Sequence, residues 1–278
     1  MRQGSGAASI VDHYERAGLL QRLEAALRDD GVDVDRPTIE QLAPYDQFHG
    51  RGLEATEEAA AAMPVRRGDR LLDVGSGLGG PARWIARQYG CRVVGVDLTP
   101  AFCEVATELT RRVGMAASVG FQVGDALRLP FEDACFDGAY SINVAMNIAD
   151  KAAFHREIRR VLKPGGWLWL GEIARGTGPE PDYPMPWAAS PSASFLATPD
   201  ETIAKLVQAG FEVLHVERTR AKVLAYGERS RAIVAAGGKP PHRAVMLVHG
   251  ETAAAAMRNS ARAMAEGRVE PIELLARR

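Results

Sequence analysis

LLDVGSGLGG, residues 71–80, is the most informative stretch of this 278-residue chain. An apolar strand ends in an acid, a loop with alternate glycines follows, and a helix is expected to begin near Pro81. Glycines are needed where the backbone turns sharply and where a ligand must approach it without side chains in the way. A strand, a glycine loop and a helix in this order indicate a nucleotide-type cofactor site at the carboxyl end of a parallel sheet.

Asp73 distinguishes between two classes of cofactor. Gly75, Gly77 and Gly80 also satisfy the dinucleotide fingerprint G-x-G-x-x-G. A carboxylate two residues before the first glycine would lie close to a pyrophosphate with two negative charges, which is unfavourable. It suits a ligand with a cationic part, such as the sulfonium and α-ammonium groups of S-adenosylmethionine. An NAD-dependent oxidoreductase remains the alternative.

Two further acids follow the next apolar runs of the sequence. Asp97 ends the run at 92–97 and can accept hydrogen bonds from both ribose hydroxyls, which fits either cofactor. Asp125 follows the run at 119–123 and can accept a hydrogen bond from an adenine amino group, with Ala126 beside the ring. Both acids also have a structural interpretation, since Asp often caps helices and Gly-Asp is common in turns.

Five motifs occur in order: DVGSGLGG, VVGVD, GDALRLPF, FDGAYSINVAMNI and LKPGGWLWLGE. Together they resemble the class I S-adenosylmethionine-dependent methyltransferases. The resemblance is greatest to the small-molecule branch of methyltransferase type 11 proteins, with sarcosine/dimethylglycine and ubiquinone-biosynthesis enzymes. It covers roughly residues 65–220. It implies an α/β, Rossmann-like fold with a doubly wound, seven-stranded, mostly parallel sheet whose last strand is antiparallel.

The resemblance also implies a cofactor site. S-adenosylmethionine is the expected cofactor, S-adenosylhomocysteine is the product, and no metal is expected. The residues expected to bind the cofactor are Asp73, Gly75, Ser76, Gly77, Gly79, Asp97, Leu98, Asp125, Ala126 and Asn143.

His49 and Asn143 are the catalytic candidates. His49 lies in the segment YDQFHG, residues 45–50, which proteins of this kind often fold over the cofactor. An imidazole titrates near neutral pH and can accept a proton. Asn143 stands where donor and acceptor usually meet, and it could orient them without removing a proton. The structural alternatives are a packed histidine and a helix-capping asparagine.

Aromatic residues and a proline-rich segment could shape the acceptor site. The segment at 174–197 holds five prolines and follows the fifth predicted strand, so it could be a lid, an acceptor wall or an ordinary surface loop. Four aromatic side chains could enclose a cationic group or simply belong to the core. They are Tyr14, Tyr45, Phe48 and Trp187.

The rest of the chain suggests two parts, an N-terminal helical cap at 1–64 and a methyltransferase core at 65–278. Apolar spacing predicts helices at 12–30 and 53–63. Towards the C-terminus we expect helices at about 221–236 and 251–266, and a last strand at 269–275 that completes a hairpin.

Composition narrows the function class. With 34 basic and 35 acidic residues, no strong field is available to attract nucleic acid. No apolar run reaches the ~18 residues of a membrane span, and residues 1–9 lack the apolar core of a signal peptide. We therefore expect a cytoplasmic protein without nucleic-acid or membrane partners. A homodimer is left open.

The expected activity is in-line transfer of the sulfonium methyl group to a nitrogen or oxygen of a small-molecule acceptor. The resemblance to sarcosine/dimethylglycine enzymes favours an amine. The alternatives are a C-methyltransferase that acts on a quinol-like ring, and a protein that binds the cofactor without transferring the methyl group.

Overall fold

The computed structural model describes residues 13, 14 and 18–278. The expectations for residues 1–9, and for the first residues of the helix predicted at 12–30, lie outside the described residues, apart from His13 and Tyr14. Within the described part, no helix is long and apolar enough to cross a membrane. The predicted division of the chain at residues 64 and 65 stays a prediction.

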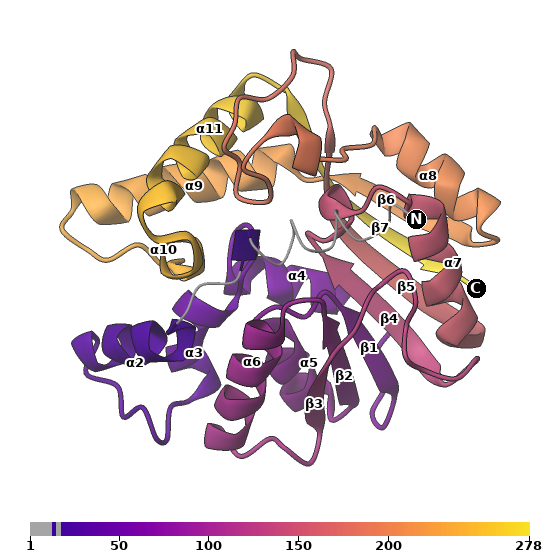
Figure 1. Cartoon of the computed structure of the whole chain (residues 1–278), viewed down its shortest axis with the longest axis horizontal. Coiled ribbons are helices and arrows are strands. Elements are labelled where there is room, and N and C mark those ends of the chain that lie inside the picture. Colours follow the sequence, from indigo (N-terminus) through magenta and orange to yellow (C-terminus); the bar gives the residue numbers. More distant parts are fainter. Residues whose placement is uncertain (1–12, 15–17) are drawn as a thin grey trace.

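A seven-stranded sheet forms the centre of the molecule, in the order β3-β2-β1-β4-β5-β7-β6 (Figure 1). The first five strands are parallel, and they are β1 (Arg70–Val74), β2 (Arg92–Asp97), β3 (Val119–Val123), β4 (Phe136–Ile142) and β5 (Leu162–Arg175). The last strand, β7 (Val269–Arg277), lies between β5 and β6 (Glu212–Arg218) and is antiparallel to both. This arrangement confirms the predicted α/β fold.

Both faces of the sheet are buried, as expected for parallel strands. Successive side chains of a strand point to opposite faces. Leu72 and Val74 therefore pack in one apolar cluster with Leu168 and Leu170, whereas Leu71 packs in the cluster on the other face. The sheet is therefore packed against apolar side chains on both faces.

Helices form most of the connections between successive strands. Those of the core are α5 (Gly80–Tyr89), α6 (Pro100–Arg112), α7 (Lys151–Val161) and α8 (Pro199–Gln208). Local sequence features explain where two of these helices begin or end. Gly90 adopts a left-handed conformation after α5, and Thr198 with Glu201 forms a capping box at the start of α8.

The helices α2 (Leu19–Asp29), α3 (Ile39–Asp46) and α4 (Leu53–Ala62) lie before the first strand. Leu19, Leu23 and Leu27 of α2 pack in one cluster with Phe102 and Leu109 of α6. The helix predicted over 12–30 is interrupted at Gly18, although His13 and Tyr14 at its predicted start are helical. Gly18 has a left-handed conformation (φ 75°), so α2 begins at Leu19.

Residues 219–268 form an insertion between β6 and β7, and these two strands pair antiparallel, as the predicted hairpin requires. It contains α9 (Arg220–Ala235), α10 (Ala244–His249) and α11 (Ala253–Ala265), and the sequence did not predict α10. In Figure 1 these helices are grouped above α2 and α3. The last strand consequently pairs with β6 without a direct turn, and the insertion adds a wall to the molecule.

Candidate active site

A large cavity of ≈ 1480 Å³ opens at the carboxyl edge of the sheet. Its volume exceeds the ~300–1,000 Å³ of a typical small-molecule site, so a cofactor and an acceptor can be held together. Its lining includes His49 and nine of the ten residues expected to bind the cofactor: Asp73, Gly75, Ser76, Gly77, Asp97, Leu98, Asp125, Ala126 and Asn143. Gly79 is the one that does not line it.

The glycines of the loop after β1 are required for two different reasons. Gly75, Gly77 and Gly79 all have positive φ values, of 78°, 50° and 76°. A Cβ on Gly75 would lie 2.2 Å from Cγ2 of Val144, and one on Gly79 would lie 2.4 Å from Cζ of Phe121. Gly79 therefore serves packing, whereas Gly75 and Gly77 also expose their backbone to the cavity.

Asp97 ties this loop to the end of β2. Its Oδ2 accepts a hydrogen bond from the Gly77 amide at 2.8 Å, and its Oδ1 accepts one from the Thr99 amide at 2.9 Å. Burial raises the pKa of Asp97, while the hydrogen bonds from Thr99 and Gly77 lower it. Each carboxylate oxygen can accept a second hydrogen bond, which is what a ribose diol at this edge would supply.

Asp73 has an unsatisfied oxygen in the same cavity. The side chain is buried, and its Oδ2 has no hydrogen-bond partner among the described residues. Burial raises the pKa of Asp73 to about 8; an interaction with Tyr140 lowers it, and the charge of Asp97 raises it further. A buried carboxylate oxygen without a partner is costly. The site therefore fits a cationic ligand group, such as the α-ammonium of S-adenosylmethionine.

Asp125 and Ala126 stand at the rim of the cavity, after β3. Oδ1 of Asp125 accepts a hydrogen bond from the Leu127 amide at 2.8 Å, so this oxygen stabilises the local turn. The residue is exposed and still lines the cavity. Its geometry is thus compatible with both the structural and the adenine-binding interpretation.

His49 is buried, with both ring nitrogens directed at protein atoms. Nδ1 lies 3.1 Å from the carbonyl oxygen of Gly50, and Nε2 lies 3.0 Å from Oγ1 of Thr56 and 3.4 Å from Oε1 of Gln47. Burial lowers the pKa of His49 to about 4, although the hydrogen bond to Gly50 opposes this shift. The imidazole is therefore neutral near pH 7, and it borders the cavity without presenting a free nitrogen to it.

Asn143 directly follows β4 in a left-handed conformation (φ 56°), which asparagine tolerates better than most residues. Its backbone N–H donates a hydrogen bond to the Gly171 carbonyl at 2.7 Å, and the residue lines the cavity. Nearby, Asn147 donates from Nδ2 to the Trp187 carbonyl at 2.6 Å and accepts from the Tyr14 hydroxyl at 3.3 Å. Asn147 therefore links three segments that border the cavity.

The four aromatic residues do not form one enclosure. The rings of Tyr14 and Phe48 meet edge to face at 5.9 Å, whereas the Tyr45 hydroxyl binds Asp30 at 2.7 Å. Trp187 donates from Nε1 to Ser194. In the part of the chain that the structure describes, Tyr45 and Trp187 make no ring contact with the other two.

The proline-rich segment forms a wall of the cavity. Because β5 extends to Arg175, the loop begins at 176 rather than at 174. Met185 and Trp187 pack in a cluster with Met146 and Met264, and the Phe195 amide donates to the Met146 carbonyl at 2.8 Å. Movement of this segment as a lid stays a prediction.

The insertion between β6 and β7 provides a part of the lining through residues that the sequence did not single out. Its members are Val223, Leu224, Tyr226, Gly227, Ser230, Arg231, Pro240, Pro241, His242, Val245, Met257, Ser260, Ala261, Met264 and Ala265. The sequence predicted α9 as a helix, but none of its residues is buried, so no apolar stripe indicates which face borders the cavity. The length of chain between the sixth and seventh strands was the one feature that indicated an additional wall.

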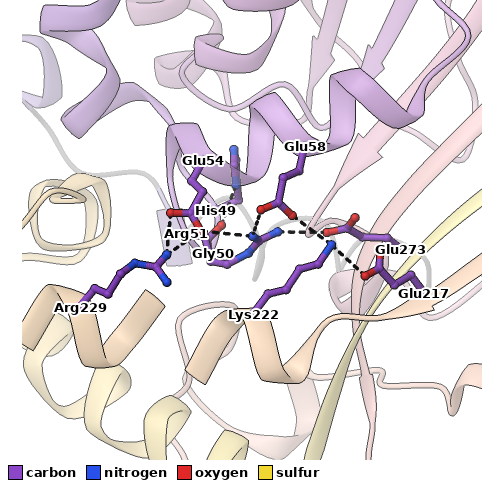
Figure 2. A network of polar contacts seen from close by, with 9 residues as sticks. All are labelled: His49, Gly50, Arg51, Glu54, Glu58, Glu217, Lys222, Arg229 and Glu273. Carbon is purple, nitrogen blue, oxygen red and sulfur yellow. Dashed lines mark hydrogen bonds and ion pairs between the residues drawn. The ribbon is translucent and has the colours of Figure 1, made fainter. Parts of the chain in front are cut away.

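An ion-pair network holds the loop after α3 against the insertion (Figure 2). The Arg51 guanidinium is buried and lies 2.9 Å from Glu58 and 3.3 Å from Glu273. From α9, Lys222 pairs with Glu58 at 3.1 Å and Arg229 pairs with Glu54 at 2.7 Å. The loop that contains His49 is thereby joined to α4, α9 and β7.

Replacing Arg51 with alanine is expected to lower the free energy of unfolding by about 3 kcal/mol, because one partner of a buried ion pair is removed. Arg277→Ala on β7 is the matched control. Arg277 pairs with Glu212 in solvent, so its loss should change stability by less than about 1 kcal/mol. Urea unfolding of both variants measures the difference, and equal losses would contradict the buried role of Arg51.

Known proteins with sequences similar to the sheet region of this chain are methyltransferases. Residues 72–170 match a family model described as a methyltransferase domain. Methyltransferase GfsG of Streptomyces halstedii is 35% identical over 172 residues, which are 60% of this chain and 59% of that protein. Erythromycin 3''-O-methyltransferase of Saccharopolyspora erythraea is 35% identical over 182 residues, 62% of this chain and 60% of that protein. The chain thus matches about three fifths of the length of these relatives.

Solved structures extend the likeness of the fold to the whole chain. Geranyl diphosphate C-methyltransferase from Streptomyces coelicolor A3(2) superposes with a TM-score of 0.69 at 19% identity and covers 100% of this chain and 99% of its own. Phosphoethanolamine N-methyltransferase 2 of Haemonchus contortus has a TM-score of 0.74 at 21% identity, over 97% of this chain and 60% of its own. At these low sequence identities, the structural similarity shows the fold alone.

Proposed function

We propose, given that this chain contains a class I S-adenosylmethionine-dependent methyltransferase domain, that it methylates a hydroxyl group of an apolar small molecule. S-adenosylmethionine is the cofactor of such a domain. When bound, it supplies a methyl group activated by an adjacent sulfonium. The acceptor must then be aligned with that methyl group and kept from water.

The distribution of charge along the cavity supports this acceptor class. Carboxylates line it at the ends of β1, β2 and β3, where Asp73, Asp97 and Asp125 stand. Two more belong to Asp46, which pairs with Arg83, and to Asp150, which caps the start of α7. Among the described residues, the insertion and the loop after β5 contribute no acidic side chain to the lining. An ammonium acceptor would find no counter-ion on that side, so the cavity favours a neutral hydroxyl compound over the amine suggested by the resemblance.

At the cofactor end, we assign Asp97 to the ribose hydroxyls and Asp73 to the α-ammonium group. The backbone at Gly75, Ser76 and Gly77 allows close approach of the ligand. Leu98, Asp125 and Ala126 are assigned to the adenine. These assignments rest on the unpartnered oxygen of Asp73 and on the free acceptor capacity of Asp97.

At the acceptor end, we assign Asn143 to the orientation of the acceptor. We assign His49 a positioning role for the loop after α3, because both of its nitrogens face protein atoms. Oxygen attack on a methyl group requires that the hydroxyl lose its proton. Both nitrogens of His49 face protein atoms, so a general base at the acceptor end would be another group.

Binding of S-adenosylhomocysteine at pH 7 is expected to release up to one proton. The free protein holds the pKa of Asp73 at about 8, and an ammonium group beside the carboxylate would lower it. Affinity should consequently rise as the pH approaches 8. Calorimetry in two buffers of different ionisation enthalpy measures the released proton.

Asp73→Asn provides the control for this proton release. The amide does not titrate, so the buffer dependence should disappear and the affinity should fall. Unchanged proton release in Asp73→Asn would assign the titration to another group, such as Asp97, whose pKa burial also raises.

The function is tested by release of S-adenosylhomocysteine with matched acceptors of one apolar skeleton, which bear a hydroxyl, an amino group or an acidic carbon. We expect turnover with the hydroxyl compounds. Turnover with amines alone would overturn the acceptor assignment, and turnover with carbon acids alone would favour C-methylation. Tight binding of S-adenosylhomocysteine without any turnover would favour a protein that binds the cofactor without transfer.

A further inference from the structure

A second histidine from the insertion borders the cavity beside the loop after α3. His242 follows Pro240 and Pro241 between α9 and α10, and all three residues line the cavity. Its ring packs over Gly52, where a Cβ would lie 3.4 Å from ring atom Cδ2. His242 is thus within the candidate acceptor region, although nothing in its local sequence marks it.

The hydrogen bonds of His242 define which ring nitrogen is basic. Nε2 lies 2.7 Å from the carbonyl oxygen of Gln47, which can only accept. Nε2 therefore carries the proton, and Nδ1 of the neutral ring has a free lone pair. Among the described residues, no side chain or backbone group is bonded to Nδ1. This arrangement differs from that of His49, whose two nitrogens both face protein atoms.

The segment around His242 is anchored on both sides. The Arg243 amide donates to the Pro44 carbonyl at 2.7 Å, and the Arg243 guanidinium contacts both oxygens of Asp30 at 2.7 and 3.2 Å. The same guanidinium lies 4.4 Å from the ring centroid of Tyr45. These contacts, together with the bond to Gln47, hold the imidazole in place before any ligand binds.

The surroundings keep the His242 ring neutral. Burial lowers its pKa below the usual value of about 6.5, and the hydrogen bond to Gln47 opposes this shift. The ionisable groups around it are His49 of the facing loop and the neighbouring pair of Arg243 with Asp30, and Arg231 of α9 lines the same cavity. Neither guanidinium favours a charged imidazole.

We propose that His242 is the general base of the acceptor site, an inference that rests on the proposed methylation of a hydroxyl. Nδ1 accepts the hydroxyl proton while the oxygen forms its bond to the methyl carbon. The bond from that carbon to sulfur breaks, and the sulfur keeps the electron pair. The products are a methyl ether, a neutral thioether and an imidazolium on His242, which returns its proton to solvent.

Kinetics of His242→Gln, with His49→Gln as the matched variant, test this role. Loss of a general base is expected to lower kcat by about 10²–10⁴-fold, while the affinity for S-adenosylhomocysteine changes by less than about twofold. In the wild type at saturating S-adenosylmethionine, which removes the titration of Asp73 from the profile, kcat/KM for the acceptor should fall at acid pH as His242 becomes protonated. We expect this acid limb to vanish in His242→Gln and to persist in His49→Gln.

A second readout does not depend on turnover. Long-range ¹H–¹⁵N spectra of the free protein should show the Nε2–H tautomer for His242. An Nδ1–H tautomer, or an acid limb that survives in His242→Gln, would overturn the role of His242 even if hydroxyl compounds are methylated. The proposed function can also fail by itself. If His242 has the Nε2–H tautomer but no hydroxyl compound is methylated, the proposed function is wrong and His242 has no proton to accept.

Discussion

Replacing Asp97 with alanine is expected to lower the affinity for S-adenosylhomocysteine by about 10²–10⁴-fold. The carboxylate is assigned to two ribose hydroxyls, and each hydrogen bond to a charged acceptor contributes about 1.5–3 kcal/mol. The same carboxylate fixes the Gly77 amide at 2.8 Å, so the loop after β1 also loses an anchor. Among the described residues, no other side chain of the cavity combines both roles.

Isothermal titration calorimetry measures this loss directly. Asp133→Ala is the matched control, because Asp133 is 76% exposed and pairs with Arg160 outside the cavity. Its affinity for the ligand should stay within about twofold of the wild type, which is below about 0.5 kcal/mol. An Asp97→Ala variant that binds as tightly as the wild type would reject the assignment of Asp97 to the cofactor.

Gly75→Ala is expected to destabilise the protein by about 2–5 kcal/mol and to abolish cofactor binding. A Cβ at this position would lie 2.2 Å from Cγ2 of Val144, and overpacking of this kind costs about 1–3 kcal/mol. The backbone has a φ of 78°, and this left-handed conformation costs a residue with a side chain about 1–2 kcal/mol more. Relief of either strain would move the loop that borders the cavity.

Gly114→Ala separates the two contributions. Gly114 has a φ of 73°, and no atom lies within 4 Å of the position that a Cβ would take there, so only the conformational cost applies. Adding Val144→Ala to Gly75→Ala should recover the overpacking part. Urea unfolding measures all three variants, and equal losses for Gly75→Ala and Gly114→Ala would show that contact with Val144 is unimportant.

Local signals explain why the sheet and the cofactor end could be predicted. Asp73 and Asp97 directly follow or end apolar runs, and parallel strands bring their carboxyl ends to one edge. The glycines of residues 75–79 mark a turn that few other residues can adopt. Each of these features lies close in sequence to the element that positions it.

The acceptor end could not be predicted in the same way, because its contacts join distant segments. His242 is oriented by the carbonyl of Gln47, 195 residues away in sequence. The ring nitrogens of His49 are directed at Thr56 and Gly50, and no sequence pattern reveals that orientation. The helix α9 has no buried residue, so periodicity did not show that it would border a cavity.

The most direct measurement is the fate of a ¹³C-labelled methyl group supplied on S-adenosylmethionine to the purified protein and an apolar hydroxyl compound. NMR of the recovered product identifies the atom to which the label is bonded. We predict a labelled methoxy group, formed in equal amount to S-adenosylhomocysteine. A label bonded to nitrogen or carbon, or a label that stays on the cofactor with every hydroxyl compound, would contradict the proposed function.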